Sequence, residues 1–287
     1  MPSGPMGRLA LFLTLLLTLS TVMGCAVGRH DVPEITGLPE TFSSTGEASL
    51  SEQWWMGFDD PALNKVIEEG LSGSPDLAVW FDRLDQAEAL ARKAGATWWP
   101  SVSVGGSASR SGEWGDDTPE SYANNYSASG TVSYEIDLWG RVRSTRHAAV
   151  YDAHSSREDL RAAVLSLSAR IAATWYEIAE ARSQVVVLSE QVEANEQTLE
   201  IVTMRFRGGL VGAVDVLWQE QLLESSRGNL ALAESRLEVL RNQLAVMVGR
   251  VPQAHVVDEE AALVALPPLP DAGVPSELLQ RRPDLRA

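Results

Sequence analysis

Two segments in the first half of the chain alternate apolar and polar residues with a period of two. Between 101 and 111, valine, glycine and alanine alternate with serine. From 122 to 138, one face carries aromatic and aliphatic residues, and the other carries small hydroxyls, amides and acids. A polar segment around Gly115–Pro119 separates the two. The pattern predicts a β-hairpin with strands at 101–111 and 122–138.

Beyond Arg141 the apolar period changes to seven. One series begins at Val164 and a second at Val216, and seven-residue spacing sustained this far indicates coiled-coil helices. We expect helices at 141–206 and 214–248, the first roughly 100 Å long at 1.5 Å per residue. The short glycine-bearing gap between them predicts an antiparallel helical hairpin. Two shorter helices are expected at 61–71 and 75–97, each with proline at its first position.

The polar face of the second strand ends in Ser133, Glu135 and Asp137. A strand pair that is apolar on one side and polar on the other is typical of a transmembrane β-barrel wall, with the polar side lining a wet lumen. From the strands alone, a hairpin packed on a soluble core remains an alternative. Two strands cannot stand alone in a membrane, because their edge groups would lack hydrogen-bond partners. The barrel interpretation therefore needs further strands from other chains or from further sequence.

The N-terminus has the layout of a signal peptide at 1–24, with Arg8 before an apolar stretch too short to span a bilayer. The sequence "VMGC" follows and ends at Cys25, the only cysteine. It resembles a bacterial lipobox, which predicts lipidation of Cys25 and, because Ala26 follows, outer membrane localisation. An ordinary secretory signal with a chance cysteine is the alternative. Residues 25–53, rich in Gly, Pro, Ser and Thr, are expected to form a tether.

Charge and motif content argue against several function classes. The net charge of −16 argues against nucleic acid as a partner, since phosphate binding requires clustered Lys and Arg. The four histidines are scattered without a zinc signature, and "RGGLVG" lacks the strand and lysine of a phosphate-binding loop. We therefore expect no enzymatic activity, no metal and no cofactor.

The end of the chain echoes its beginning. After a Pro/Ala/Val-rich linker at 251–274, the segment 275–287 carries Pro275, Leu278 and Pro283-Asp284-Leu285, which echo the order of Pro61, Leu63 and Pro75-Asp76-Leu77. A chance likeness is the alternative, because the echo is short. This echo predicts that 275–287 begins a second copy of a unit whose first copy is 54–250.

Together, these stretches resemble the TolC-like outer-membrane efflux family, in its lipoprotein (NodT-type) branch. The resemblance covers nearly the whole chain and rests on six stretches: "VMGC", "WWMGFDDPAL", "SPDLA" leading to "WWPSVSV", "YEIDLWGRVR", "RFRGGLVGAVDVL" and "PSELLQRRPDL". Ser74 and Met23 depart from the family's usual residues, and the second repeat is missing. The expected fold is mainly α with a β-hairpin, in which long antiparallel coiled-coil helices continue from transmembrane barrel strands.

The resemblance implies a homotrimer in outer membrane lipid, with the hairpin in a shared barrel and the helices in a periplasmic tunnel. It implies a passive export duct for drugs or other small molecules, energised by an inner-membrane pump. A periplasmic adaptor protein would connect the two by contacting the tip between the long helices. The expected contact residues are Gly208, Gly209, Leu210, Val211, Gly212 and Ala213.

Two other classes remain as alternatives. A lipid-anchored periplasmic adaptor also carries a coiled-coil hairpin, but the chain lacks the Gly- and β-rich half-motifs that flank such a hairpin. A structural coiled-coil lipoprotein would not need the two-sided strand pattern.

Overall fold

A computed structural model describes residues 42, 45–48, 51–115, 118–252 and 262–287. The described chain contains two compact units. The first includes Gln86–Ala153, and the second consists of Leu38–Asp85 and His154–Ala287. The predicted signal peptide and Cys25 lie outside the described residues.

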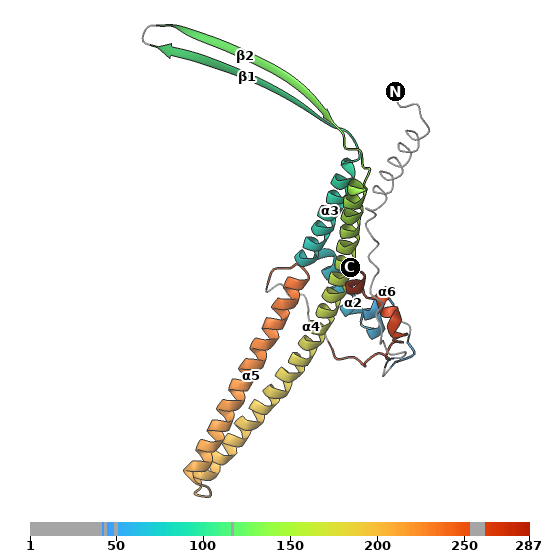
Figure 1. Ribbon diagram of the computed structural model, residues 1–287. Coiled ribbons are helices and arrows are strands. Elements are labelled where there is room, and N and C mark those ends of the chain that lie inside the picture. The colour runs from blue at the N-terminus through green and yellow to red at the C-terminus, as the bar shows by residue number, and fades with distance from the viewer. Residues whose placement is uncertain (1–41, 43–44, 49–50, 116–117, 253–261) are drawn as a thin grey trace, which may run out of the picture. The chain divides into compact units, whose positions relative to one another are not determined.

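The first unit contains one long antiparallel hairpin, drawn in Figure 1 as a curved two-stranded ribbon. Strand β1 spans Ser101–Gly115 and β2 spans Thr118–Ser133, with Ser101 opposite Ser133 and Ser107 opposite Ser127. The strands extend further toward the turn than expected. The expected end of the second strand at 138 is wrong, because β2 stops at Ser133 although Tyr134, Ile136 and Leu138 continue the alternation. The backbone there turns instead to meet the start of a helix.

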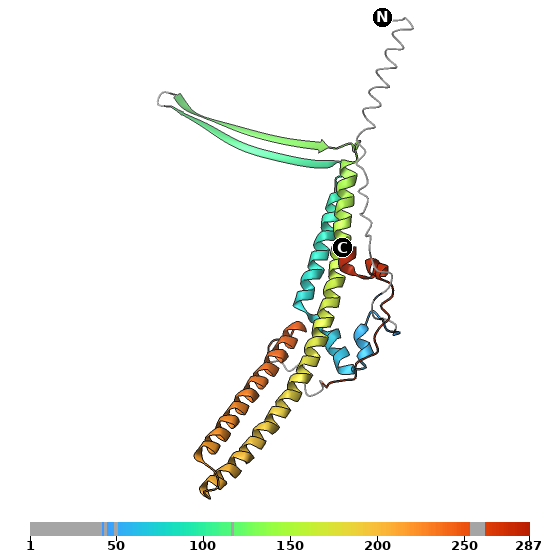
Figure 2. The ribbon, with the colours of Figure 1, turned by 60° about the horizontal axis from the view of Figure 1, so that its bottom comes forward.

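Helix α3 (Pro75–Ala96) precedes the hairpin and helix α4 (Arg141–Arg207) follows it. Helix α5 (Ala213–Met247) returns antiparallel to the distal part of α4, and the two lie side by side in both views (Figures 1 and 2). Ile171, Ile178, Leu237 and Leu244 of the two heptad series are buried. The expected fold class, mainly helical with long helices and one antiparallel hairpin, is confirmed.

The core of the second unit lies where a short N-terminal segment packs on α4. This segment comprises a 3-10 helix (Trp54–Phe58) and helix α2 (Pro61–Gly73). Its buried Leu63 and Ile67 join Ile171, Trp175 and Leu244 in one apolar cluster. Such burial contributes about 1.5–3 kcal/mol for each large side chain.

Asp60 connects α2 to α4 through both of its carboxylate oxygens. Oδ1 accepts from the backbone N–H groups of Ala62 at 3.1 Å and Leu63 at 3.0 Å, and so caps α2. Oδ2 accepts from Nε1 of the buried Trp175 at 3.0 Å. Burial, together with the charge of Asp60, raises the pKa of Tyr176 to about 12.

The C-terminal described segment forms three short turns at Pro275–Glu277, Leu278–Arg281 and Pro283–Arg286. Pro283 occupies the first position of its turn with Asp284 behind it, as Pro75 and Asp76 do in α3. Arg286 reaches the buried Glu158 of α4 at 3.2 Å. None of the helices in the described part of the chain combines the length and apolar content needed to cross a membrane.

Replacing Asp60 with alanine should lower the free energy of unfolding by about 2 to 4 kcal/mol. The helix cap accounts for about 1 kcal/mol of this, and the buried indole N–H left without an acceptor accounts for the rest. Denaturant titration followed by helical circular dichroism measures the change. The matched control is Asp76→Ala in the exposed first turn of α3, which should cost less than about 1 kcal/mol. Equal losses for the two variants would contradict the role given to Asp60.

Candidate functional site: hairpin, strand–helix junction and helical tip

The two faces of the hairpin differ sharply in chemistry. The strand register places valine, alanine and glycine on one face: Val102, Val104, Gly106 and Ala108 opposite Val132, Gly130, Ala128 and Tyr126. The other face carries hydroxyls and an amide: Ser101, Ser103, Ser107 and Ser109 opposite Ser133, Thr131, Ser127 and Asn125. The Oγ atoms of Ser107 and Ser127 are hydrogen-bonded to each other at 2.9 Å. No charged side chain lies in these rows, and the described side chains on both faces are exposed.

The apolar face ends at Arg110 and Tyr122, near the turn of the hairpin. The Arg110 guanidinium lies over the Tyr122 ring, 4.5 Å from its centroid. From Val102 to Ala108 the uninterrupted apolar row covers roughly 20 Å at 3.3–3.4 Å per residue. A face of this length and composition suits the apolar band of an outer-membrane barrel.

Asp137 and Gly140 shape the junction between β2 and α4. The Asp137 carboxylate accepts from the backbone N–H groups of Val142 and Arg143, each at 3.0 Å. These are first-turn donors that have no partner within the helix. Gly140 has φ 77°, in the left-handed region that residues with a side chain adopt at a cost. The junction is thus a helix cap placed directly after a glycine-dependent turn.

Glu135 pairs with Arg141, the first residue of α4. Arg141 Nε donates to Glu135 Oε1 at 2.9 Å, and its Nη2 contacts the second oxygen. The hydrogen bond from Arg141 lowers the pKa of Glu135. For Asp137, partial desolvation acts to raise the pKa, but the two backbone donors and the neighbouring arginines outweigh it and lower the pKa.

Of the three residues expected on one strand face, only Ser133 lies in a strand. Glu135 and Asp137 follow its end, because their carboxylates are engaged by the helix that begins at Arg141. That these three residues face a channel lumen stays a prediction.

The turn between α4 and α5 requires glycine. Gly209 has φ 71°, and Leu210 N–H donates to the Arg205 carbonyl at 2.9 Å, a hydrogen-bond pattern that commonly ends helices. Gly212 then precedes α5, and its N–H donates to Asp215 Oδ2 at 2.8 Å. A Cβ added at Gly212 would meet only ordinary contacts, the nearest being Asp215 Oδ2 at 3.5 Å. Gly209 therefore serves the turn, whereas Gly212 leaves the backbone open to approach.

Exposed apolar side chains surround this turn. Leu210, Val214, Leu217 and Trp218 are each more than 60% exposed. Beside them lies a cavity of about 630 Å³ lined by residues of both helices, including Val202, Trp218 and Leu222. The heptad pattern does not point to Trp218 and Leu217, because the heptads follow only the buried face of α5. The i, i+3, i+4 spacing of Val214, Leu217 and Trp218 is a signal that could have found this second face.

A metal site is not assembled in the described residues. Within them, no three His, Cys, Asp or Glu side chains gather to hold a metal ion.

The family of the chain follows from its sequence. Residues 66–250 match the profile of the outer membrane efflux protein family. The chain belongs to this family of outer membrane channels. Its location is accordingly the outer membrane, with the long helices in the periplasm.

Two relatives illustrate the relation. The pyoverdine export outer membrane protein OpmQ of Pseudomonas putida is 32% identical over 254 residues, which cover 85% of this chain and 54% of the relative. Nodulation protein T of Rhizobium leguminosarum bv. trifolii is 27% identical, over 96% of this chain and 59% of the relative. The chain thus spans between half and two thirds of the length of these relatives.

Solved structures show the same fold. The outer-membrane channel OprN superposes with a TM-score of 0.73 at 25% identity, covering 91% of this chain and 60% of that one. The Campylobacter jejuni CmeC outer membrane channel gives 0.72 at 24% identity, over 90% of this chain and 58% of that one.

Replacing Asp137 with alanine should fray the first turn of α4. We expect roughly fivefold faster hydrogen exchange at the Val142 and Arg143 amides. Because the pKa of Asp137 is lowered, the cap is fully formed above its ordinary pKa of 3.8 and is lost as the pH falls through its lower, folded-state value. Exchange resolved by residue over this pH range checks both effects. Unchanged exchange in Asp137→Ala, with Asp137→Asn as the milder control, would show that the carboxylate does not hold the junction.

Proposed function

We propose that the chain forms part of the outer membrane channel of a tripartite efflux system, a passive duct for drugs or other small molecules. The observation that carries this proposal is the hairpin, with one apolar and one hydroxyl face, joined by a capped junction to a long coiled coil. Lipid suits the first face and a wet lumen suits the second. Membership of the outer membrane efflux family supports the assignment.

The channel is a homotrimer in this proposal. Among the described residues the two strands of the hairpin pair only with each other, which leaves edge groups that hydrocarbon cannot satisfy. A closed wall needs roughly eight or more strands. Three copies of the hairpin supply six strands to a shared barrel, and the strands of the predicted second repeat complete it. The hydroxyl faces line its lumen.

The tip of α4 and α5 is the proposed contact for a periplasmic adaptor, which connects the duct to an inner-membrane pump. Gly208, Gly209 and Gly212 leave the backbone accessible, while Leu210, Val211 and Ala213 supply small or apolar contacts. Another helical hairpin can approach such a surface closely. The exposed Val214, Leu217 and Trp218 extend the same apolar surface along α5.

The duct itself performs no chemistry in this account, so the protein is not an enzyme and needs no cofactor. An adaptor role is disfavoured because the family match covers 66–250, the region that holds both the hairpin and the coiled coil. A purely structural coiled-coil lipoprotein is disfavoured for the same reason. That residues 275–287 begin a second repeat stays a prediction.

Cys25 is the proposed lipid anchor. Metabolic labelling with a radioactive fatty acid tests this proposal separately from export. The parent should take up label and Cys25→Ser should not, whereas label in the variant would exclude the anchor.

Introducing a large side chain at the tip should block adaptor binding. We expect Gly212→Trp to reduce adaptor pull-down and drug export by about tenfold or more, since a bulky ring prevents close backbone approach. Gly212→Ala is the matched control, because its Cβ fits the turn, and it should retain both activities within about twofold. Assembly is followed by heat-modifiable migration on gels. Undiminished binding and export by an assembled Gly212→Trp channel would rule out the tip as the contact.

A further inference from the structure

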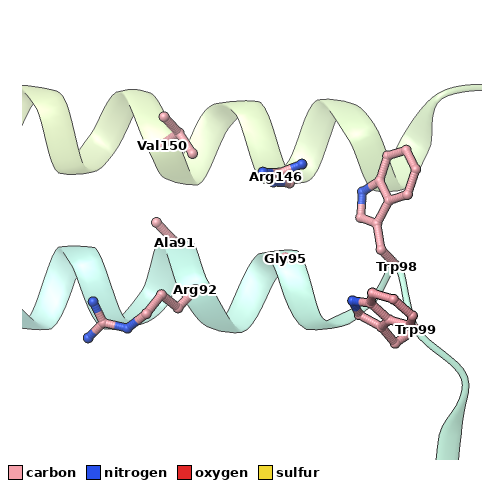
Figure 3. A pocket seen from close by; sticks show the side chains of 7 residues that line it. All are labelled: Ala91, Arg92, Gly95, Trp98, Trp99, Arg146 and Val150. Atoms are coloured by element: carbon pink, nitrogen blue, oxygen red, sulfur yellow. The ribbon is translucent and has the colours of Figure 1, made fainter.

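A cavity of about 630 Å³ lies between the end of α3 and the start of α4, within the first unit. It is lined by Ala91, Arg92, Gly95, Trp98, Trp99, Arg146 and Val150. Ala91 and Val150 face each other across the gap between the helices, and Gly95 lies opposite Arg146 (Figure 3). A Cβ at Gly95 would come within 3.8 Å of Arg146 Nε, so the absent side chain leaves part of this space open.

Every side-chain hydrogen-bonding group that lines the cavity is a donor. The two guanidinium groups and the two indole N–H groups have no acceptor capacity, and the other three residues have no polar side-chain atom. Figure 3 shows both indole nitrogens on the ring edges nearer Gly95 and Arg146. A cavity whose polar side chains are all donors, two of them cationic, suits an anion with several acceptor oxygens. This lining contrasts with the net charge of −16 on the chain.

The cations are little engaged by the protein itself. Among the described residues Arg146 has no hydrogen-bond or ion-pair partner. Arg92 points away from the tryptophans in Figure 3 and meets Glu88 only at 4.0 Å, with 72% of its side chain exposed. An exposed pair at that distance contributes little. Both guanidinium groups therefore remain available to a ligand at the cost of a small rearrangement.

The position of the cavity indicates which class of anion it binds. Trp99 lies two residues before β1, and the apolar strand face begins at Val102, roughly 10 Å further at strand spacing. Tryptophan next to an apolar band is typical of a membrane–water boundary. The helices lie on the periplasmic side, where the leaflet of the outer membrane consists of glycerophospholipid. Phosphate at that depth is the charge complement of Arg92 and Arg146.

We propose that this cavity binds the phosphate-bearing headgroup of a glycerophospholipid in the inner leaflet of the outer membrane. Arg146 contacts the phosphate, the indole N–H groups of Trp98 and Trp99 add hydrogen bonds, and Arg92 closes the open side. The inference rests on the hairpin lying in the membrane, as the proposed function requires, but lipid binding does not depend on export. Headgroup binding at this place would fix the depth of the strand–helix junction.

Native mass spectrometry of the assembled protein in a lipid-free detergent tests the proposal. The probes are dioleoyl phosphatidylglycerol, dioleoylglycerol without phosphate, and inorganic phosphate. We expect saturable binding of phosphatidylglycerol to the parent. Its dissociation constant should rise about tenfold or more in Arg92→Gln/Arg146→Gln, because charge-assisted hydrogen bonds are lost. The matched control is Arg92→Gln/Arg205→Gln. It removes the same total charge but keeps Arg146, because Arg205 lies in the last turn of α4. Its affinity for phosphatidylglycerol should fall clearly less.

A second variant separates the site from a general charge effect. Gly95→Leu fills the cavity without changing charge and replaces glycine by a better helix former, so it should fold and also weaken lipid binding.

Unchanged phosphatidylglycerol affinity in both Arg92→Gln/Arg146→Gln and Gly95→Leu would overturn the proposal. Equal binding of dioleoylglycerol, or competition by inorganic phosphate at the concentration of the lipid, would overturn it as well. Loss of trimers instead of lipid in Arg92→Gln/Arg146→Gln would assign the cavity to a neighbouring copy of the chain. Export is measured in parallel, so a protein that binds lipid but does not export refutes only the proposed function.

Discussion

The carboxylate of Asp137 sits where the chain changes from a strand to a helix, and the rest of the structure depends on that change. A strand repeats every two residues and a helix every 3.6, so a chain that passes directly from one to the other leaves unpaired backbone groups. Here two N–H groups of α4 donate to Asp137, and Gly140 supplies the left-handed backbone of the turn. The change is completed within the seven residues from Tyr134 to Gly140. Because this segment is short, β2 is followed almost directly by the first turn of α4.

The helices could be predicted closely from the sequence, because heptad spacing leaves a strong and local signal. The helix expected at 141–206 is α4, which spans Arg141–Arg207 in the structure. The helix expected at 214–248 is α5, which spans Ala213–Met247. The end of β2 could not be predicted in this way. Tyr134, Ile136 and Leu138 continue the alternation, but strand pairing ends at Ser133 because the backbone that follows is committed to the helix cap. Apolar–polar alternation along the sequence indicates that the two faces of a strand differ. It does not indicate at which residue the pairing with the neighbouring strand ends.

The candidate sites also differ in whether a local sequence pattern predicts them. The glycine-bearing turn between α4 and α5 could be predicted because glycine and a break in the heptads coincide in the sequence, whereas its role as an adaptor contact is implied by the family resemblance and stays a prediction. The exposed Trp218 was missed, since it lies on the face of α5 that the buried heptads do not follow. The cavity at the base of the hairpin was also missed. Trp98 and Arg146 are 48 positions apart, and they meet only because β1 and β2 pair along their full length. A local sequence pattern therefore does not predict that these two residues line the same cavity.

The central claim is that the apolar face of the hairpin contacts lipid and the hydroxyl face lines water. Cysteine scanning through Ser101–Ala108 of the assembled protein in membranes, with Cys25 as the only native cysteine, tests it most directly. A water-soluble maleimide should label Ser101, Ser103 and Ser107 positions strongly and leave Val102, Val104 and Ala108 positions nearly unlabelled. Equal labelling of both faces, or preferential labelling of the valine face, would contradict the account.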